Sequence, residues 1–357
     1  MKRYPLLLLL AFLPAFTACL DDSGLEDDDT YLGNFEACWR ALDEHYCFFA
    51  EKGVDWDQVY RSYRPYFRDS VKTVAQELRL LDSMLDLLKD GHVNIYAPFN
   101  TARYWAWYED YPRNFDSNLL ERYYLGTNYW TAAGFKYGLM GDTVGYIRYE
   151  NFTASPGETN IDYMLAALNM AKGLIIDVRD NGGGSLTNVP LIASRFGEEE
   201  LIYGYMRHKT GPGHDDFSDL KPLRLDAYQD GRIYWDAATQ PVVVLTNRSA
   251  YSATNIFVMA MKASDGIGGR IIKTMGDRTG GGSGMPFSTV LPNGWTLRFS
   301  ACPMYDRNRI SVESGIDPDY KVDMDSVSMV VAHKDDIIEA AREYINSHTR
   351  KTYEAEQ

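Results

Sequence analysis

The chain has 357 residues, of which 45% are hydrophobic and 24% are charged, and its formal net charge is −14 at pH 7. This length is sufficient for one large domain or two, with a substantial buried core. The acidic balance argues against nucleic acid as a partner, because binding to phosphates requires clustered lysine and arginine.

Residues 1–19 have the pattern of a secretory signal peptide, with early positive charges, an apolar stretch and small residues before a cysteine. The apolar stretch is short for a membrane span, which needs about 20 apolar residues. Thr17 and Ala18 directly precede Cys19 and resemble a bacterial lipoprotein processing site. We therefore expect cleavage before Cys19 and a lipid on its sulfur. The alternative is an ordinary signal peptide with an incidental cysteine.

Residues 20–33 are acidic and contain few apolar side chains, which predicts a disordered tether. A lipid on Cys19 would attach this tether to a membrane of the cell envelope. Asp21 and Asp22, just past the cysteine, favour the outer membrane, on its periplasmic or its surface face.

Residues 34–100 predict a small N-terminal helical domain. Its first helix has apolar residues at three- and four-residue spacing, namely Phe35, Cys38, Trp39, Leu42 and Tyr46. Two further helical stretches follow at 55–67 and 73–89, the first with Asp55 as a candidate cap. The domain ends in "DGHVNIYAPF", where alternating apolar residues indicate a short strand.

The cysteines that follow Cys19 are at positions 38, 47 and 302, and no Cys-x-x-Cys pair occurs. The sequence therefore gives no case for a metal site or a redox dithiol. Cys38 and Cys47 could form a disulfide in an oxidising envelope. Both lie in an apolar helical pattern, however, and this pattern favours buried thiols.

Residues 101–140 are interpreted as an aromatic-rich connector, because ten aromatic side chains lie between positions 101 and 130. One role for them would be a wall that contacts a peptide, since aromatic side chains suit partly wet interfaces. We favour packing between two layers, because aromatic side chains are commonly buried.

From residue 141 to residue 357 the chain alternates between strands and helices. Continuous apolar runs such as "GLIIDV" and "PVVVLTN" are typical of buried strands, and amphipathic helices separate them. A final amphipathic helix is expected over about 334–347. The alternation predicts a mixed α/β layer fold for this part of the chain.

Two glycine-rich loops have different implications. "DNGGG" (180–184) lacks the G-x-G-x-x-G of a dinucleotide loop and holds more glycine than a plain turn needs. Consecutive glycines let a ligand approach the backbone and its N–H groups, as an oxyanion site requires. "TGGGSG" (279–284) lacks the Gly-Lys-Ser/Thr ending of a phosphate loop, which argues against nucleotide binding.

The stretch "NRSAYSATNIF" (247–257) places Ser249 and Ser252 between an apolar strand and a helical pattern. From this stretch alone, either serine could be a helix cap or a nucleophile. A nucleophilic hydroxyl needs a base. Of the six histidines, His92 alone lies at a glycine-marked helix-to-strand junction, where loops tend to carry site residues.

Five motifs along the chain resemble those of a known peptidase class: "GYIRYENF", "LIIDVRDNGGG", "TNRSAYSATNIF", "GDRTGGGSG" and "VESGIDPDYKV". They resemble, in the same order, motifs of the serine peptidases of the C-terminal-processing and tricorn class. The resemblance begins near Asn34 and extends to the C-terminal helix. It implies an α/β fold with a crotonase/ClpP-like mixed β-α core and an N-terminal helical cap domain.

The resemblance also implies the groups that perform the chemistry. Ser252 matches the nucleophile, which leaves Ser249 a turn or capping role. The amide of Ala253, together with that of Gly182 or Gly183, matches the oxyanion-binding groups.

The base distinguishes two branches of this class. C-terminal processing enzymes use a lysine where this chain has Gly282, whereas the tricorn-like branch uses a histidine and a glutamate, which His92 and Glu313 match. Gly91 stands where tricorn has a serine that relays between the two. A direct His92–Glu313 contact, a water, or a different acid such as Asp90 are the alternatives for this link.

The resemblance implies hydrolysis of a peptide or protein substrate through an acyl-enzyme, with no metal and no cofactor. Many members of this class carry a PDZ domain before the core, but the stretch between "DGHV" and "GYIRY" in this chain is too short for one. One alternative is a lipoprotein with a decayed triad that binds glycans, peptides or apolar ligands on the same fold. Another keeps a Ser–Lys mechanism, with Lys262 or Lys273 as the base.

Overall fold

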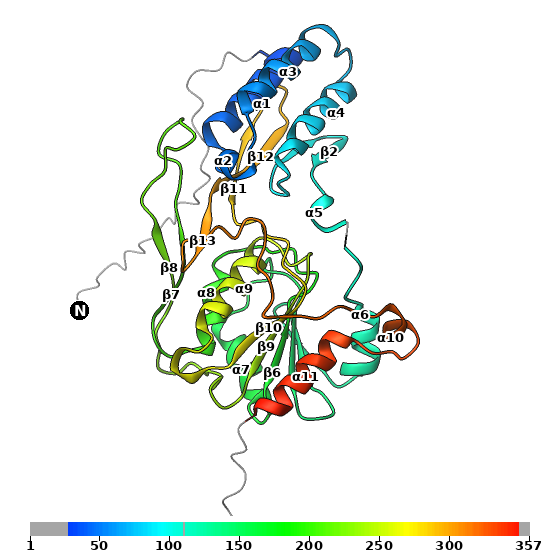
Figure 1. Ribbon diagram of the computed structural model, residues 1–357, viewed down its shortest axis with the longest axis vertical. Coiled ribbons are helices and arrows are strands. Elements are labelled where there is room, and N and C mark those ends of the chain that lie inside the picture. Colours follow the sequence, from blue (N-terminus) through cyan, green and yellow to red (C-terminus); the bar gives the residue numbers. More distant parts are fainter. Residues whose placement is uncertain (1–27, 110, 350–357) are drawn as a thin grey trace, which may run out of the picture.

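The computed structural model describes residues 28–109 and 111–349 of the chain. It has an upper lobe that contains the N-terminal helices and a lower lobe around a large sheet (Figure 1). The predicted signal peptide and Cys19 lie outside the described residues. Residues 31–33, predicted to belong to the tether, form the first turn of a helix instead, because the side chain of Thr30 accepts the N–H of Gly33.

Helices form the outer layer of the upper lobe. They are α1 (Tyr31–His45), α2 (Phe49–Lys52), α3 (Trp56–Asp69), α4 (Val74–Leu85) and the 3-10 turn η1 (Asp86–Leu88). The side chains of Asp55 and Thr73 cap α3 and α4, as the sequence indicates for Asp55. The short α2 is an addition to the three helices expected from the sequence.

The helices pack on an antiparallel sheet whose strand order is β11-β12-β1-β2. These strands are β1 (Asn94–Ala97), β2 (Asn100–Arg103), β11 (Met285–Val290) and β12 (Thr296–Cys302). Leu297 and Phe299 of β12 are fully buried in the apolar cluster of this lobe. The upper lobe thus also contains residues 285–302, which the sequence analysis assigned to the α/β core.

The lower lobe contains a seven-stranded sheet of order β14-β10-β9-β6-β5-β4-β3. Its strands are β3 (Trp130–Ala132), β4 (Phe135–Leu139), β5 (Gly145–Tyr149), β6 (Leu174–Asp177), β9 (Val242–Thr246), β10 (Ile272–Gly276) and β14 (Tyr320–Lys321). Neighbouring strands pair in parallel along β14-β10-β9-β6-β5. At the other edge of the sheet, β4 pairs antiparallel with both β5 and β3.

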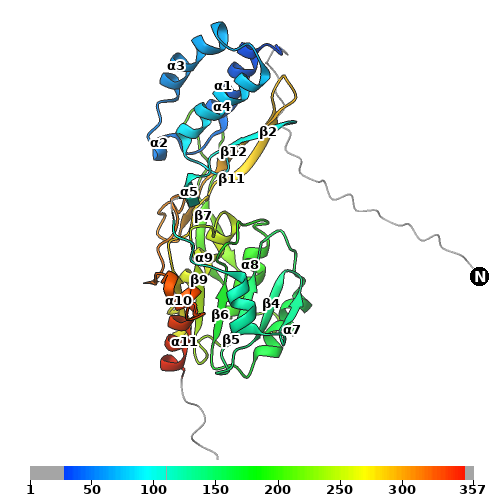
Figure 2. The ribbon, with the colours of Figure 1, turned by 90° about the vertical axis from the view of Figure 1, so that its right-hand side faces the viewer.

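Helices cover both faces of this sheet (Figure 2). One face packs against α7 (Glu158–Leu168), α8 (Asn188–Ala193) and α9 (Ala253–Ser264), and the other against α11 (Asp336–His348). Successive residues of β9 alternate between the two apolar clusters, with Val242 and Val244 in one and Val243 and Leu245 in the other. Burial on both faces explains the unbroken apolar runs and confirms the predicted α/β core with its N-terminal helical cap.

Short elements complete the fold. The stretch 101–140 carries α5 (Ala106–Glu109), α6 (Ser117–Leu119) and the π-helical turn η2 (Leu120–Leu125) before β3 and β4. A three-stranded sheet is formed by β7 (Leu201–Met206), β8 (Lys221–Leu225) and β13 (Met304–Asp306). The remaining elements are η3 (Ser194–Phe196), η4 (Ile267–Gly269) and α10 (Ser326–Val330).

Two expectations about individual side chains can be compared with the fold. Cys38, Cys47 and Cys302 are free thiols, and Cys38 is fully buried, which raises the pKa of its thiol. The aromatic side chains of 101–130 differ in their exposure to solvent: Phe115 is buried, whereas Tyr123 is 52% exposed. Among the residues described, no helix is long and apolar enough to cross a bilayer.

Candidate active site

Ser252 stands on a sharp turn between β9 and α9. It precedes the first residue of α9, and its backbone has φ 58° and ψ −123°, a conformation that costs a non-glycine residue about 1–3 kcal/mol. Its N–H donates to the carbonyl oxygen of Gly281 at 2.9 Å. Its side chain makes no capping hydrogen bond to the described residues of α9, so the hydroxyl is available for other contacts.

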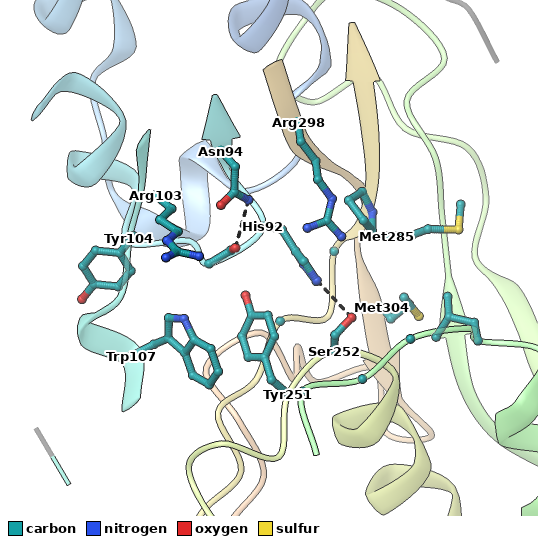
Figure 3. Close-up of a pocket in the computed structure, with 18 of the residues that line it drawn as sticks. His92, Asn94, Arg103, Tyr104, Trp107, Tyr251, Ser252, Met285, Arg298 and Met304 are labelled. Atoms are coloured by element: carbon teal, nitrogen blue, oxygen red, sulfur yellow. Dashed lines mark hydrogen bonds between the residues drawn. The ribbon is translucent and has the colours of Figure 1, made fainter. Parts of the chain in front are cut away.

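His92 approaches Ser252 from the other lobe. Its Nε2 atom lies 3.0 Å from the Oγ atom of Ser252, although 160 residues separate the two in the chain (Figure 3). The loop before β1 holds the histidine, whose backbone N–H donates to the Asp90 carboxylate at 2.8 Å. The predicted base and nucleophile are therefore in hydrogen-bond contact.

The environment of His92 keeps its ring neutral at pH 7. The side chain is buried, and this burial is the main reason that the pKa of His92 is lowered to about 4. The positive charges of Arg298 and Lys52 also lower this pKa, whereas the negative charge of Asp90 opposes them. A neutral imidazole can accept a proton, which is the state that a general base needs.

Glu313 is buried near this pair but contacts other groups. One carboxylate oxygen accepts from Nζ of Lys52 at 3.0 Å, and the other accepts from the N–H of Ser283 at 2.8 Å. Burial and the nearby Asp90 raise the pKa of Glu313 to about 7, while Lys52 lowers it. No described side chain forms a hydrogen bond with Nδ1 of His92, so the ring has no direct link to the carboxylate of Glu313 or of Asp90.

Asp90 belongs to the same buried cluster. Its Oδ2 atom accepts from the hydroxyls of Tyr46 at 3.1 Å and Ser300 at 2.8 Å, and its Oδ1 atom accepts from the backbone of His92. These bonds fix the loop that carries His92 to both α1 and β12. Asp90 therefore positions the histidine through its backbone rather than through its ring.

The glycine loop lies directly beside Ser252. A Cβ atom at Gly183 would lie 2.7 Å from the Cβ atom of Ser252, so only glycine fits there. The N–H of Gly183 donates to the side chain of Asn181 at 3.0 Å. The N–H groups of Gly182 and Ala253 have no hydrogen-bond acceptor among the described residues. Of the two glycines predicted for an oxyanion site, Gly182 is therefore the one with a free amide.

Tyr251 and Trp107 account for both departures from the peptidase motifs. Their rings stack with centroids 4.1 Å apart. A Cβ atom at Gly282 would lie 2.3 Å from the Tyr251 ring, so the lysine of the processing enzymes cannot be placed there. A Cβ atom at Gly91 would lie 2.7 Å from Nε1 of Trp107 and 2.9 Å from the Tyr251 hydroxyl, which leaves no space for the relay serine.

The two lysines considered as alternative bases are engaged elsewhere. Lys262 forms an ion pair with Asp319 and contacts the hydroxyl of Thr274 at 3.3 Å. Lys273 forms an ion pair with Asp265. Neither lysine lines the cleft that contains Ser252, which argues against a relocated Ser–Lys pair.

Introducing a side chain at Gly282 should destabilise the fold. Gly282→Ala is expected to lower the free energy of unfolding by about 2–4 kcal/mol, because the new Cβ overlaps the Tyr251 ring and φ is +74°. Gly294→Ala is the matched control, since its φ is +81° but no atom lies within 4 Å of the new Cβ. Its expected cost is about 1–2 kcal/mol. Equal shifts of the two urea unfolding midpoints would contradict this account of Gly282.

Ser252 and His92 face a cleft of about 520 Å³ between the two lobes (Figure 3). One part of its lining is apolar and consists of Leu186, Met285, Pro286 and Met304. Another part combines aromatic and basic side chains, namely Tyr104, Trp105, Trp107, Arg103 and Arg298. The aromatic stretch 101–130 thus lines part of the cleft with its first residues, and a contact of these side chains with a peptide stays a prediction.

Several site residues were not found from the sequence. Lys52 ends a short helix and has no sequence feature that separates it from a surface lysine. Arg298 lies within an ordinary strand pattern. Tyr251 could have been noticed, because it directly precedes the predicted nucleophile.

A serine on a strand-to-helix turn, paired with a histidine and flanked by a glycine loop, is the arrangement of serine hydrolases. Residues 143–322, half of the chain, match the model of peptidase family S41. The chain therefore belongs to this family of serine peptidases. Residues 27–84 match the C1 domain of tricorn protease, in agreement with the predicted tricorn-like resemblance.

Individual relatives support the same assignment. A candidate peptidase from Parabacteroides merdae ATCC 43184, known from a crystal structure, shares 47% of its sequence with this chain. The two structures superpose with a TM-score of 0.81 over 89% of this chain and 97% of that one. The carboxy-terminal processing protease CtpB of Bacillus subtilis (strain 168) is 30% identical over 128 residues, which are 35% of this chain. The matched stretch spans 23% of the length of CtpB.

Two further solved structures share the fold at low identity. Mature CPAF complexed with lactacystin has a TM-score of 0.61 and 12% identity, over 89% of this chain and 97% of that one. Tricorn protease has a TM-score of 0.54 and 16% identity, over 90% of this chain and 37% of that one. At these identities the likeness concerns the fold alone.

Proposed function

We propose that this protein hydrolyses peptide bonds through an acyl-enzyme on Ser252, with His92 as the general base. The observation that carries the proposal is the 3.0 Å contact between Nε2 of His92 and Oγ of Ser252. Each side chain comes from a different lobe, and Ser252 holds a strained backbone conformation that directs it into the cleft. A chain that only binds ligands would have no need of this strain or of this pairing.

The reaction follows from these positions. Neutral His92 accepts the hydroxyl proton as Oγ of Ser252 attacks the carbonyl carbon of the peptide. The resulting imidazolium then donates that proton to the departing amine, which leaves an ester on Ser252. A water molecule, deprotonated by the same imidazole, hydrolyses the ester and restores the serine hydroxyl.

Two free backbone amides are suited to stabilise the oxyanion. Ala253 directly follows Ser252 and begins α9, where the helix dipole favours negative charge, and Gly182 lines the same cleft as Ser252. We assign the oxyanion site to this pair of amides. The neighbouring Gly183 has no side chain, which leaves space beside Ser252. Losing one such donor typically lowers the rate about 100- to 1000-fold.

In this proposal Glu313 is a positioning residue, because it touches the loop that borders His92 and not His92 itself. Its carboxylate accepts from Ser283, and its backbone carbonyl accepts from the N–H of Gly282 at 3.1 Å. Gly284, which follows Ser283, presents its backbone carbonyl to His92, and this carbonyl raises the pKa of the ring. The negative charge of Asp90 also favours the imidazolium that forms during the reaction.

We further propose that a lipid on Cys19 anchors the protein to a membrane of the cell envelope, most simply the outer membrane. The support is the order of Thr17, Ala18 and Cys19 after an apolar stretch, followed by acidic residues. The substrate would then be a peptide or protein that reaches this membrane.

A fluorophosphonate probe tests the nucleophile directly, because it reacts with activated serines. Native protein should be labelled, heat-denatured protein should not, and fragmentation of the labelled peptide should place the adduct on Ser252. Ser249 lies in the same peptide and serves as an internal control. Products from a defined peptide mixture, identified by mass spectrometry, test hydrolysis. Absence of labelling, or an adduct on Ser249, would refute the proposed nucleophile.

A further inference from the structure

The cleft is positively charged although the chain is strongly acidic. The formal net charge is −14, yet the described residues that line the cleft include Arg103 and Arg298 and no aspartate or glutamate. A basic cleft in an acidic protein attracts anionic groups and repels cationic ones. The charge of the cleft therefore bears on which peptides enter it.

The two arginines belong to one row of the upper sheet. Asn94 of β1 pairs with Arg103 of β2 on one side and with Arg298 of β12 on the other. Residues in register across a sheet point to the same face, and two strand spacings place the ends of the row about 10 Å apart at the backbone. Figure 3 shows all three side chains at the cleft, with Arg298 beside His92.

Arg298 has no protein partner for its charge. It is half-buried, and within residues 28–109 and 111–349 its side chain forms no ion pair and no hydrogen bond. Its charge nevertheless acts on the catalytic region, since it lowers the pKa of both His92 and Tyr251. A partly desolvated guanidinium gains most from a planar anion that it can bind with two parallel hydrogen bonds, such as a carboxylate.

Arg103 is held differently. Its guanidinium lies over the ring of Trp105, 3.3 Å from the centroid, and its backbone N–H donates to Asp82. The stacking fixes the orientation of the group at the rim of the cleft. Arg103 therefore adds positive charge to the entrance, while Arg298 is the group near the reacting atoms.

The geometry points to Arg298 as the residue that selects substrates, by binding a peptide carboxylate close to the scissile bond. This inference rests on the proposed function and names its substrate class: peptides that carry aspartate or glutamate near the cleaved bond, or that end there with a free C-terminus. Both sources present the same carboxylate to the same guanidinium. The rest of the lining near Ser252 includes apolar side chains, so Arg298 is the charged group that a substrate would meet close to the reacting atoms.

Binding to the Ser252→Ala protein tests the inference without turnover. Four pools of dansyl-labelled random hexapeptides would share one design. They would differ only in two features: whether they contain Glu or Gln, and whether their C-terminus is free or amidated. Pools with a carboxylate are expected to bind about tenfold to a hundredfold more tightly than the amidated Gln pool. The amidated Glu pool isolates the side chain, and the Gln pool with a free C-terminus isolates the terminal carboxylate.

Variants of Arg298 assign the preference to this residue. Adding Arg298→Gln to Ser252→Ala should remove the preference, and adding Arg298→Lys should retain part of it, because lysine keeps the charge but not the paired donors. Arg122→Gln removes an equal charge from an exposed position outside the cleft and should leave the preference as it is. Equal binding of all four pools, or a preference that survives Arg298→Gln, would overturn the inference.

Failure of the proposed function would look different. Wild-type protein would then show neither labelling by the fluorophosphonate nor cleavage of the pools, while the carboxylate preference of binding would still be measurable. If cleavage occurs, the cleaved bonds should lie near a carboxylate in the wild type and lose that bias in Arg298→Gln. Cleavage without such a bias in the wild type would overturn the inference and leave the proposed hydrolysis standing.

Discussion

Replacing either Ser252 or His92 with alanine is expected to lower the rate constant for peptide hydrolysis by about four orders of magnitude or more. In the proposed mechanism one proton passes between the two side chains across the 3.0 Å contact, so each is expected to be ineffective without the other. Ser252→Ala removes the atom that forms the acyl bond. His92→Ala removes the one base in contact with that atom among the described residues. Rates of hydrolysis and of fluorophosphonate labelling measure both losses.

The double variant makes this prediction more specific. Residues that act as a unit are not additive, so Ser252→Ala combined with His92→Ala should be no slower than the slower single variant. Ser249→Ala is the matched control, because Ser249 lies on the same turn and outside the cleft. It is expected to retain nearly full activity. A His92→Ala protein that reacts like the wild type would show that another group acts as the base.

The core of the fold could be predicted because local pattern and final structure agree there. The run from Val242 to Leu245 is apolar at every position since both faces of the sheet are covered, and the sequence displays this directly. The β11–β12 hairpin is different. Its residues look like any antiparallel pair, and nothing local indicates that β12 pairs with β1, about 200 residues earlier in the chain, in the upper lobe. Long-range pairing of this kind is decided by packing under the helices.

The candidate site divides in the same way. Ser252 and His92 carry local signatures, a turn before a helix and a glycine junction, and these led to a pair that is in contact. Lys52, the partner of Glu313, has no such signature in the sequence. It differs from a surface lysine only because the fold brings α2 beside the segment that carries Glu313. The missing lysine and the missing relay serine were visible as glycines, but their common cause, the stacked rings of Tyr251 and Trp107, required the structure.

Both halves of the site depend on the contact between the lobes. The upper lobe supplies His92, Asp90 and Lys52, and the lower lobe supplies Ser252 and Glu313. The ion pair between Lys52 and Glu313 joins the two lobes near the proposed catalytic pair. Its removal should therefore affect stability and the arrangement of the site together.

Lys52→Met is expected to lower the free energy of unfolding by about 3–5 kcal/mol at pH 8.5. The side chains of Lys52 and Glu313 are 17% and 2% exposed, so the change leaves a buried carboxylate without its cation. Burial is the largest influence on the pKa of Lys52 and lowers it, but the carboxylates of Glu313, Asp90 and Glu51 together raise this pKa above its ordinary value. These carboxylates together thus outweigh the desolvation of the ammonium group, and urea unfolding of the variant measures the loss of the Lys52–Glu313 contact.

The pH dependence gives this prediction its sign. The pKa of Glu313 is already raised to about 7, and without Lys52 it should rise further. A carboxyl whose folded-state pKa lies above its unfolded value of about 4.3 contributes fully at low pH and loses that contribution as the pH rises through the folded value. The penalty of Lys52→Met should therefore be small at pH 5 and largest at pH 8.5.

Two further variants separate the pair from its surroundings. Lys52→Met combined with Glu313→Gln should recover most of the stability at pH 8.5, because no uncompensated charge is left in the interior. Arg68→Met breaks the exposed pair with Asp69, whose side chains are 56% and 58% exposed, and should cost at most about 1 kcal/mol at either pH. A Lys52→Met penalty equal at both pH values would mean that the lysine stabilises the lobe contact by packing alone. Glu313 would then hold the loop 282–284 beside His92 without help from its charge.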